Sequence, residues 1–199
     1  MDAIALLKRD HEGVKHLFQQ FEQLTERAQK SKQKLVMKMI RELAIHAAVE
    51  EMLFYPTVRT AALAKGTRTG EKAADTVLES LEEHHVVKWM LSELENMDPS
   101  DERYDAKVTV MMENVKHHIE EEEEELFPAV RKLLDGELLE ALGERMAKAK
   151  KLAPTRPHPA APDTPPGNLM AAPLAAMMDR GRDLVREMAE RMTRRGADA

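Results

Sequence analysis

The stretch HHIEEEEEELFP, from His117 to Pro128, has a counterpart earlier in the chain, HAAVEEMLFYP, from His46 to Pro56. Aligned on their prolines without a gap, the two stretches match at four functional positions: His46 with His118, Glu50 with Glu122, Glu51 with Glu123, and Tyr55 with Phe127. A histidine and a glutamate four residues apart lie on one face of a helix, one turn from each other. This spacing is typical of metal ligands.

A second repeat precedes each of these stretches. HEGVK, beginning at His11, matches HHVVK, beginning at His84, and the two histidines lie 35 and 34 residues before His46 and His118. The chain therefore reads as two copies of a helical hairpin, each with one histidine on its first helix and a His-x-x-x-Glu pair on its second. Two such hairpins predict an all-α fold, a four-helix bundle.

Composition limits the kind of metal site. The 199 residues include no cysteine, which excludes disulfide frameworks, thiolate zinc sites and iron–sulfur clusters and leaves histidine and carboxylate as the strong ligands. With 33% charged and only 4% aromatic residues, the chain favours helices, and its length allows one domain plus an appendage.

Charge and hydropathy give no reason to expect nucleic-acid or membrane binding. The net charge is -6, the N-terminus lacks the pattern of a signal peptide, and no stretch approaches the ~18 apolar residues of a membrane span. We therefore expect a soluble, cytoplasmic protein.

Periodicity predicts four long helices, at about residues 2–28, 34–65, 70–97 and 101–134. Each has an apolar stripe at three- and four-residue steps, and ionisable residues interrupt these stripes: His11, His46, Glu50, His84, His118 and Glu122. Ionisable groups in a core are costly unless they are paired or bind metal. Two mutually satisfied His-Glu pairs are the structural alternative.

Six inward ligands are too many for one tetrahedral zinc ion. Two ions fit better, with Glu50 and Glu122 bridging both and each ion taking two histidines, which leaves room for a solvent bridge and an outside ligand. Imidazole and carboxylate with open positions suit redox iron, although manganese or zinc could occupy the same site.

Tyr55, Glu51 and His85 are the candidates for further metal ligands. On a regular helix Tyr55 points about 140° away from Glu50, so it could reach the metal only if Pro56 distorts the helix; otherwise it is a packing residue. His117 lies outside the stripe, and the other five glutamates of the run at 120–125 are expected to form a solvated face, with Glu123 the least certain.

The C-terminal part is expected to be separate from the bundle of residues 1–134. Residues 135–152 predict a short helix across the bundle, and 153–168, with six prolines, an extended linker in which His158 is not a ligand. Residues 169–199 predict an amphipathic helix with Met170, Leu174, Met177, Leu184, Met188 and Met192 on its apolar side. This helix could dock on the bundle or on a second subunit, as in a homodimer.

Taken together, DHEG around His11, HAAVEEMLFYP, EEHH ending one residue after His84, and HHIEEEEEELFP resemble the hemerythrin-like, or HHE cation-binding, family over residues 2–134. The resemblance implies an up-down-up-down bundle that holds a non-haem di-iron centre, two iron ions with an oxo or hydroxo bridge, and binds dioxygen or related small molecules.

The motifs also depart from those of oxygen-carrying members. Lys88 stands where they have a fifth histidine, and His118-x-x-x-Glu122 replaces a longer His-to-Asp spacing, which makes the site more symmetric. We therefore expect a protein that binds or senses O2, NO or peroxide in oxidative or nitrosative stress. The alternatives are an enzyme with catalase-like peroxide or nitric oxide turnover, and an iron-sensing interaction protein.

Overall fold

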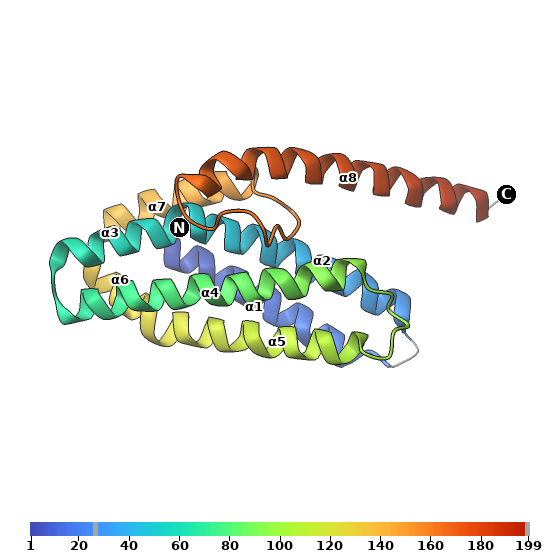
Figure 1. The fold of residues 1–199 in the computed structure, drawn as a ribbon, viewed down its shortest axis with the longest axis horizontal. Helices are drawn as coiled ribbons and strands as arrows, with labels where there is room; N and C mark the ends of the chain where they lie inside the picture. Colours follow the sequence, from blue (N-terminus) through green and yellow to red (C-terminus); the bar gives the residue numbers. More distant parts are fainter. Residues whose placement is uncertain (26–27, 198–199) are drawn as a thin grey trace.

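The computed structural model describes residues 1–25 and 28–197, with side chains described as far as residue 183 in the last helix. The elements are α1 (Ala3–Glu22), α2 (Gln29–Val49), η1 (Glu50–Phe54), α3 (Tyr55–Lys65), α4 (Arg68–Asn96), α5 (Tyr104–Glu121), η2 (Glu122–Leu126), α6 (Phe127–Leu133), α7 (Gly136–Lys150) and α8 (Gly167–Ala197). All of these regular elements are helical (Figure 1).

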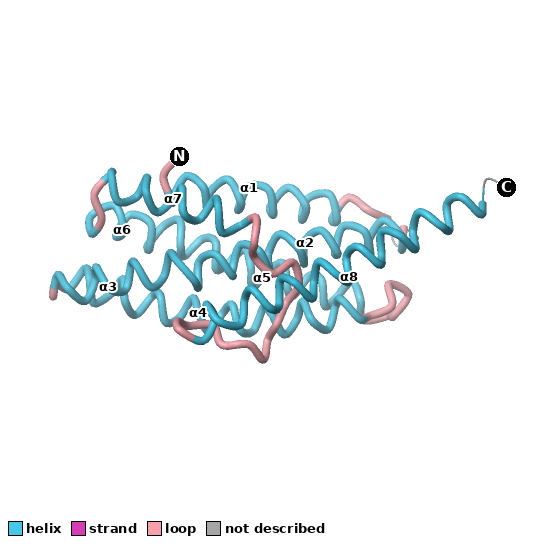
Figure 2. Tube along the Cα trace, turned by 90° about the horizontal axis from the view of Figure 1, so that it is seen from above, coloured by secondary structure: helices cyan, strands magenta, loops and turns pink. Residues whose placement is uncertain are grey.

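Four antiparallel rods make the bundle: α1, then α2 continued through η1 into α3, then α4, then α5 continued through η2 into α6 (Figures 1 and 2). This confirms the predicted up-down-up-down four-helix bundle. The first helix is shorter than expected, because α1 ends at Glu22, and the second begins earlier, at Gln29. Side-chain caps fix the starts of several helices, as where Asp2 accepts a hydrogen bond from the N–H of Ala5.

The second and fourth rods each contain one π-helical turn, η1 and η2, which ends two residues before a proline. In η1 the N–H of Tyr55 donates to the carbonyl of Glu50, five residues back, and in η2 the N–H of Phe127 donates to Glu122 in the same way. The wider turn brings the residue five positions after a glutamate back to the face on which that glutamate lies. Both halves of the chain thus carry the same local distortion at their matched glutamates.

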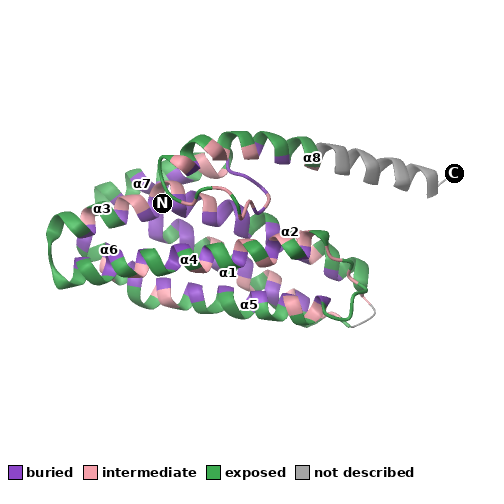
Figure 3. Ribbon diagram, in the orientation of Figure 1, coloured by how far each residue is buried: buried purple, intermediate pink, exposed green. Residues whose placement is uncertain are grey.

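The hydrophobic core is divided into two clusters. One, at the end formed by α3 and α6, includes Phe54, Tyr55 and Phe127, and the other, around α5, includes Phe18 and Met111. His11, His46, Glu50, His84, His118 and Glu122 are buried too, and Figure 3 shows buried residues along the length of the bundle. The polar centre is therefore closed off by apolar packing at both ends of the bundle.

The proline-rich segment, residues 153–166, is called the strap below. The sequence predicted an extended linker here, and the strap does lack regular helix, but it packs against the bundle instead of spanning free space. Ala153 and Thr155 are buried, and Arg156 forms an ion pair with Glu95 of α4. The cause is polar anchoring: Asp179 of α8 is fully buried and accepts hydrogen bonds from two strap N–H groups.

The last helix docks on the bundle by a face other than the expected one. Its small residues face inward, with Ala176 buried and Ala172 and Ala175 beside α2, whereas Met170 and Met177 are 79% and 70% exposed. Small side chains let the helix approach closely. The side chains of Leu184, Met188 and Met192 lie outside the described residues.

Within the described part of the chain, no helix has the length and apolar character needed to cross a membrane.

Candidate metal centre

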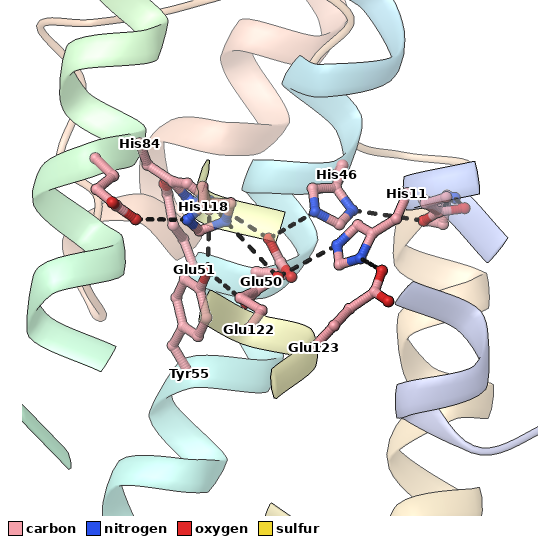
Figure 4. Close-up of polar contacts among 12 residues, drawn as sticks. His11, His46, Glu50, Glu51, Tyr55, His84, His118, Glu122 and Glu123 are labelled. Carbon is pink, nitrogen blue, oxygen red and sulfur yellow. Dashed lines mark hydrogen bonds and ion pairs between the residues drawn. The ribbon is translucent and has the colours of Figure 1, made fainter. Parts of the chain in front are cut away.

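Four histidines, one from each rod of the bundle, turn their Nε2 atoms toward a common centre (Figure 4). They form two pairs, since the rings of His11 and His46 lie 5.0 Å apart and those of His84 and His118 lie 4.8 Å apart. Each pair comes from one half of the chain. All four imidazoles are buried, with at most 6% of the residue exposed.

Glu50 and Glu122 lie between the two histidine pairs, and neither is exposed at all. One oxygen of Glu50 is 3.1 Å from His46 Nε2 and 3.4 Å from His84 Nε2. One oxygen of Glu122 is 3.2 Å from His11 Nε2 and 3.7 Å from His118 Nε2. Each carboxylate therefore contacts one histidine of each half, which is the arrangement that two bridging ligands require.

A carboxylate stands behind each histidine, on its Nδ1 side. Nδ1 lies 2.8 Å from Glu123 in His11, 2.9 Å from Glu51 in His84, 2.7 Å from Glu83 in His118, and 3.7 Å from Asp10 in His46. In His11, His84 and His118 this carboxylate can accept the Nδ1–H, which fixes the tautomer and leaves the Nε2 lone pair facing the centre, whereas Asp10 lies beyond hydrogen-bond distance of His46. The imidazoles are thus oriented as metal ligands.

Several atoms at the centre lack the partners that buried polar groups normally have. Nε2 of His11 and His46, both oxygens of Glu50 and Oε2 of Glu122 have no hydrogen-bond partner in the protein. Unpaired buried polar atoms are costly. The ligand atoms of the central residues lie close enough together to form two clusters that could each hold an ion. One consists of His11, His46, Glu50 and Glu122, and the other of Glu50, His84 and His118. The donor set fits two metal ions, which would satisfy these atoms.

Without metal, the two central carboxyls have different charge states. Burial, then the neighbouring Glu122, raises the pKa of Glu50 well above its ordinary value. Burial also disfavours the charge on Glu122, but His118 and His11 outweigh it and lower the pKa of Glu122 to about 2. Two carboxylates this close cannot both ionise cheaply, so one keeps a proton. A bound cation would take the place of that proton.

Tyr55 reaches the centre because of the π turn. Its hydroxyl donates to Glu122 Oε1 over 3.0 Å and lies 3.4 Å from His84 Nε2. On a regular helix Tyr55 would point away unless Pro56 distorted the helix, and the distortion is the turn η1 that precedes this proline. Phe127 holds the matching place in the other half, stacked on His11 with ring centroids 5.8 Å apart.

The other residues considered as ligands lie outside the centre. Glu51 is taken up by His84 and by Lys88, whose Nζ is 2.6 Å from it, and His85 contacts Trp89 at the surface. His117 is exposed and pairs with Glu121; these two form a group with Glu83, which is partly buried and also contacts Nδ1 of His118. Of the glutamate run only Glu122 is buried, as expected, while Glu123 is partly buried against His11.

Sequence reasoning missed the outer carboxylates Asp10 and Glu83. Each directly precedes the first histidine of its half, in Asp10-His11 and Glu83-His84, and each supports the second histidine of the same half. The repeat that matched the histidines therefore also carried this signal. The acidic residue that precedes the first histidine in both halves could have identified Asp10 and Glu83 as outer carboxylates.

A small cavity lies against the four imidazoles on the side toward Leu43 and Val115, away from Tyr55 and Phe127. Its volume is about 30 Å³, and apart from Lys88 its lining consists of the four imidazoles and aliphatic side chains. This is room for one or two water-sized molecules. We call it the inner cavity.

Comparisons with known proteins agree with this geometry. The family described as hemerythrin HHE cation binding domain matches residues 2–130. An uncharacterized hemerythrin-like protein of Schizosaccharomyces pombe is 30% identical over 148 residues, which cover 74% of this chain and 70% of that protein.

Two further proteins are similar. A crystal structure of a hemerythrin HHE cation binding domain-containing protein from Mycobacterium kansasii has a TM-score of 0.63 and 25% identity, covering 76% of this chain and 86% of that one. A DNA nickase of Nostoc sp. is 29% identical over 145 residues, 73% of this chain but only 38% of the nickase.

Proposed function

Because the chain belongs to the hemerythrin HHE cation-binding family, we propose that its buried histidine and glutamate cluster holds two non-haem iron ions with an oxo or hydroxo bridge. His11 and His46 would hold one ion, and His84 and His118 the other. Glu50 and Glu122 would be shared between them, and Tyr55 would bind the second ion.

The observation that carries this proposal is the orientation of the four imidazoles. Each has a carboxylate on its Nδ1 side, and each turns Nε2 toward Glu50 or Glu122, whose four oxygens include three without a hydrogen-bond partner. Purely structural His-Glu pairs would instead satisfy one another, and they would not need a second carboxylate behind each ring. Histidine and carboxylate together suit iron in preference to calcium or magnesium.

We propose that the ligand of this centre is a small molecule such as O2, NO or peroxide. The inner cavity adjoins all four imidazoles and has space for a molecule of that size. Two iron ions would supply redox chemistry toward such a small molecule, while the protein orients the side chains that bind the metal and keeps bulk water out. Binding or sensing of these molecules in oxidative or nitrosative stress is the role that this reactivity supports.

A second candidate is an enzyme with catalase-like peroxide or nitric oxide turnover at the same centre. It is favoured by the equal division of the imidazoles, two to each cluster. A reversible carrier needs one saturated and one open iron, whereas two open ions favour reaction over storage.

Metal analysis of protein from iron-supplemented cells, with ultraviolet-visible spectra before and after peroxide, tests the proposal. We expect two irons per chain, bands of an oxo-bridged pair and a spectrum that changes with peroxide. A folded protein that takes up one zinc ion or no metal would refute the di-iron centre. Oxygen release from peroxide at a rate no better than that of free iron would reject the enzyme alone.

A further inference from the structure

We propose that small ligands reach the metal centre through a vestibule beneath the strap, and that Lys88 and Ala44 form the gate between this vestibule and the inner cavity. The inference deepens the proposed function and rests on it. Four observations support it: a second cavity, two residues that line both cavities, a strap held in place over the second cavity, and a lysine between the two cavities.

The second cavity lies between the bundle and the C-terminal segment. It has a volume of about 50 Å³, and its lining combines residues of the bundle, the strap and α8: Ala48 and Met52, Pro157 and Ala161, and Ala172 and Ala175. We call it the vestibule. Figure 1 shows the strap and the start of α8 lying over α2 at this place.

The vestibule and the inner cavity share two lining residues, Ala44 of α2 and Lys88 of α4. These two side chains therefore form the wall between the outer space and the space over the imidazoles. Ala44 contributes only a methyl group, and Lys88 is a flexible chain. A movement of Lys88 alone would join the two cavities.

The roof of the vestibule is held in place. Asp179 accepts hydrogen bonds from the N–H groups of Thr155 and Arg156 over 2.9 and 3.1 Å. The guanidinium of Arg156 pairs with Glu95 of α4 and with Asp183 of α8. Because two helices, α4 and α8, anchor the strap, opening at Lys88 requires less rearrangement than lifting the strap.

An ion pair holds Lys88 between the two cavities. Its Nζ lies 2.6 Å from Oε1 of Glu51, a carboxylate that is 4% exposed and also accepts from His84 Nδ1. The Lys88 side chain is only 14% exposed. An ammonium group beside the imidazole and aliphatic side chains of the inner cavity's lining would favour entry of anions and small neutral molecules over cations.

Stopped-flow association of azide and of NO with the iron-loaded full chain tests the gate. Ala44→Leu should fill the space between the two cavities and slow both ligands by roughly tenfold or more, as a barrier higher by about 1.4 kcal/mol produces. Ala44→Gly should speed both. Lys88→Met keeps the length of the side chain but leaves Glu51 uncompensated, so azide should slow and NO should not.

Ala61→Leu is the matched control, because Ala61 is partly buried on α3 and lines neither cavity. It should leave both rates unchanged. If Ala44→Leu does not fold, the association rates of Ala44→Gly and Lys88→Met test the gate.

Parental rates in the Ala44 variants, with full iron content and normal final binding, would overturn the gate and leave the proposed function intact. A parent protein that takes up no iron, or whose iron spectrum is unaffected by azide and NO, would instead refute the proposed function and the gate with it.

Discussion

The hydroxyl of Tyr55 donates a hydrogen bond to Glu122 over 3.0 Å, from the second rod of the bundle to the fourth. The matching residue of the other half, Phe127, follows an equivalent π turn but has no hydroxyl, and it stacks on His11. Two nearly symmetric halves therefore differ by one oxygen atom at the centre. Of the two proposed ions, the one held by His84 and His118 would therefore be the one to gain a phenolate ligand.

Tyr55→Phe should keep two metal ions but change their spectrum. Burial, then Glu122 and Glu50, raises the pKa of Tyr55 well above its ordinary value in the metal-free protein, and only a bound cation would favour the phenolate. The iron-loaded parent should show a broad phenolate-to-iron charge-transfer band, which the variant lacks. The reciprocal variant Phe127→Tyr should add a second such band. A parental spectrum in Tyr55→Phe would exclude the tyrosine as a ligand.

His118→Ala and Glu122→Ala should lose half or all of the bound iron, because these residues face the centre. His117→Ala and Glu121→Ala are matched controls one residue away on the surface, and they should retain it. Iron per chain by elemental analysis decides the matter. Equal losses from both sets of variants would contradict the assignment of ligands on the fourth rod.

Asn168→Ala should loosen the π turn that brings Tyr55 inward. The N–H of Tyr55 goes to Glu50, and Pro56 has no N–H, so the carbonyl of Glu51 loses its helical partner. The buried Asn168 amide donates to that carbonyl over 3.0 Å. Removing it should cost about 1–3 kcal/mol of unfolding free energy and weaken the phenolate band.

Asn114→Ala is the control for this experiment, since Asn114 also donates its side-chain amide to a carbonyl, but at an exposed position of α5. Urea unfolding and the visible spectrum are the two measurements. Loss of stability with an unchanged band would mean that Asn168 stabilises the tail without positioning Tyr55.

In the metal-free protein, Glu51 should contribute stability that is lost as pH rises from about 4.5 to 7. Burial, only partly offset by Lys88, raises the pKa of Glu51 from 4.5 to about 7. Between these values the folded state binds a proton that the unfolded state has released, so stability falls with pH, by about 3 kcal/mol at most. Glu51→Gln should flatten this part of the unfolding profile. An equally steep profile in the variant would exclude Glu51 as its source.

The repeat in the sequence was sufficient for the architecture and for the inward histidines and glutamates. A His-x-x-x-Glu pair within the apolar stripe of a helix faces the core of the bundle, and two matched hairpins form one bundle. His11, His46, His84 and His118 needed only helical periodicity to be placed together. The absence of cysteine restricted the chemistry further.

Three features depended on the tertiary structure. Helical periodicity placed Tyr55 away from the centre, because that position holds only on a regular helix and the chain contains a π turn before Pro56. Asp10 and Glu83 act across helices, on His46 and His118 respectively, at distances that no single-helix pattern contains. The strap resembled a linker because its prolines exclude helix, whereas its packing comes from long-range hydrogen bonds to Asp179. The sequence by itself determined which groups could bind metal; contacts between distant segments decided how those groups are oriented, screened and reached.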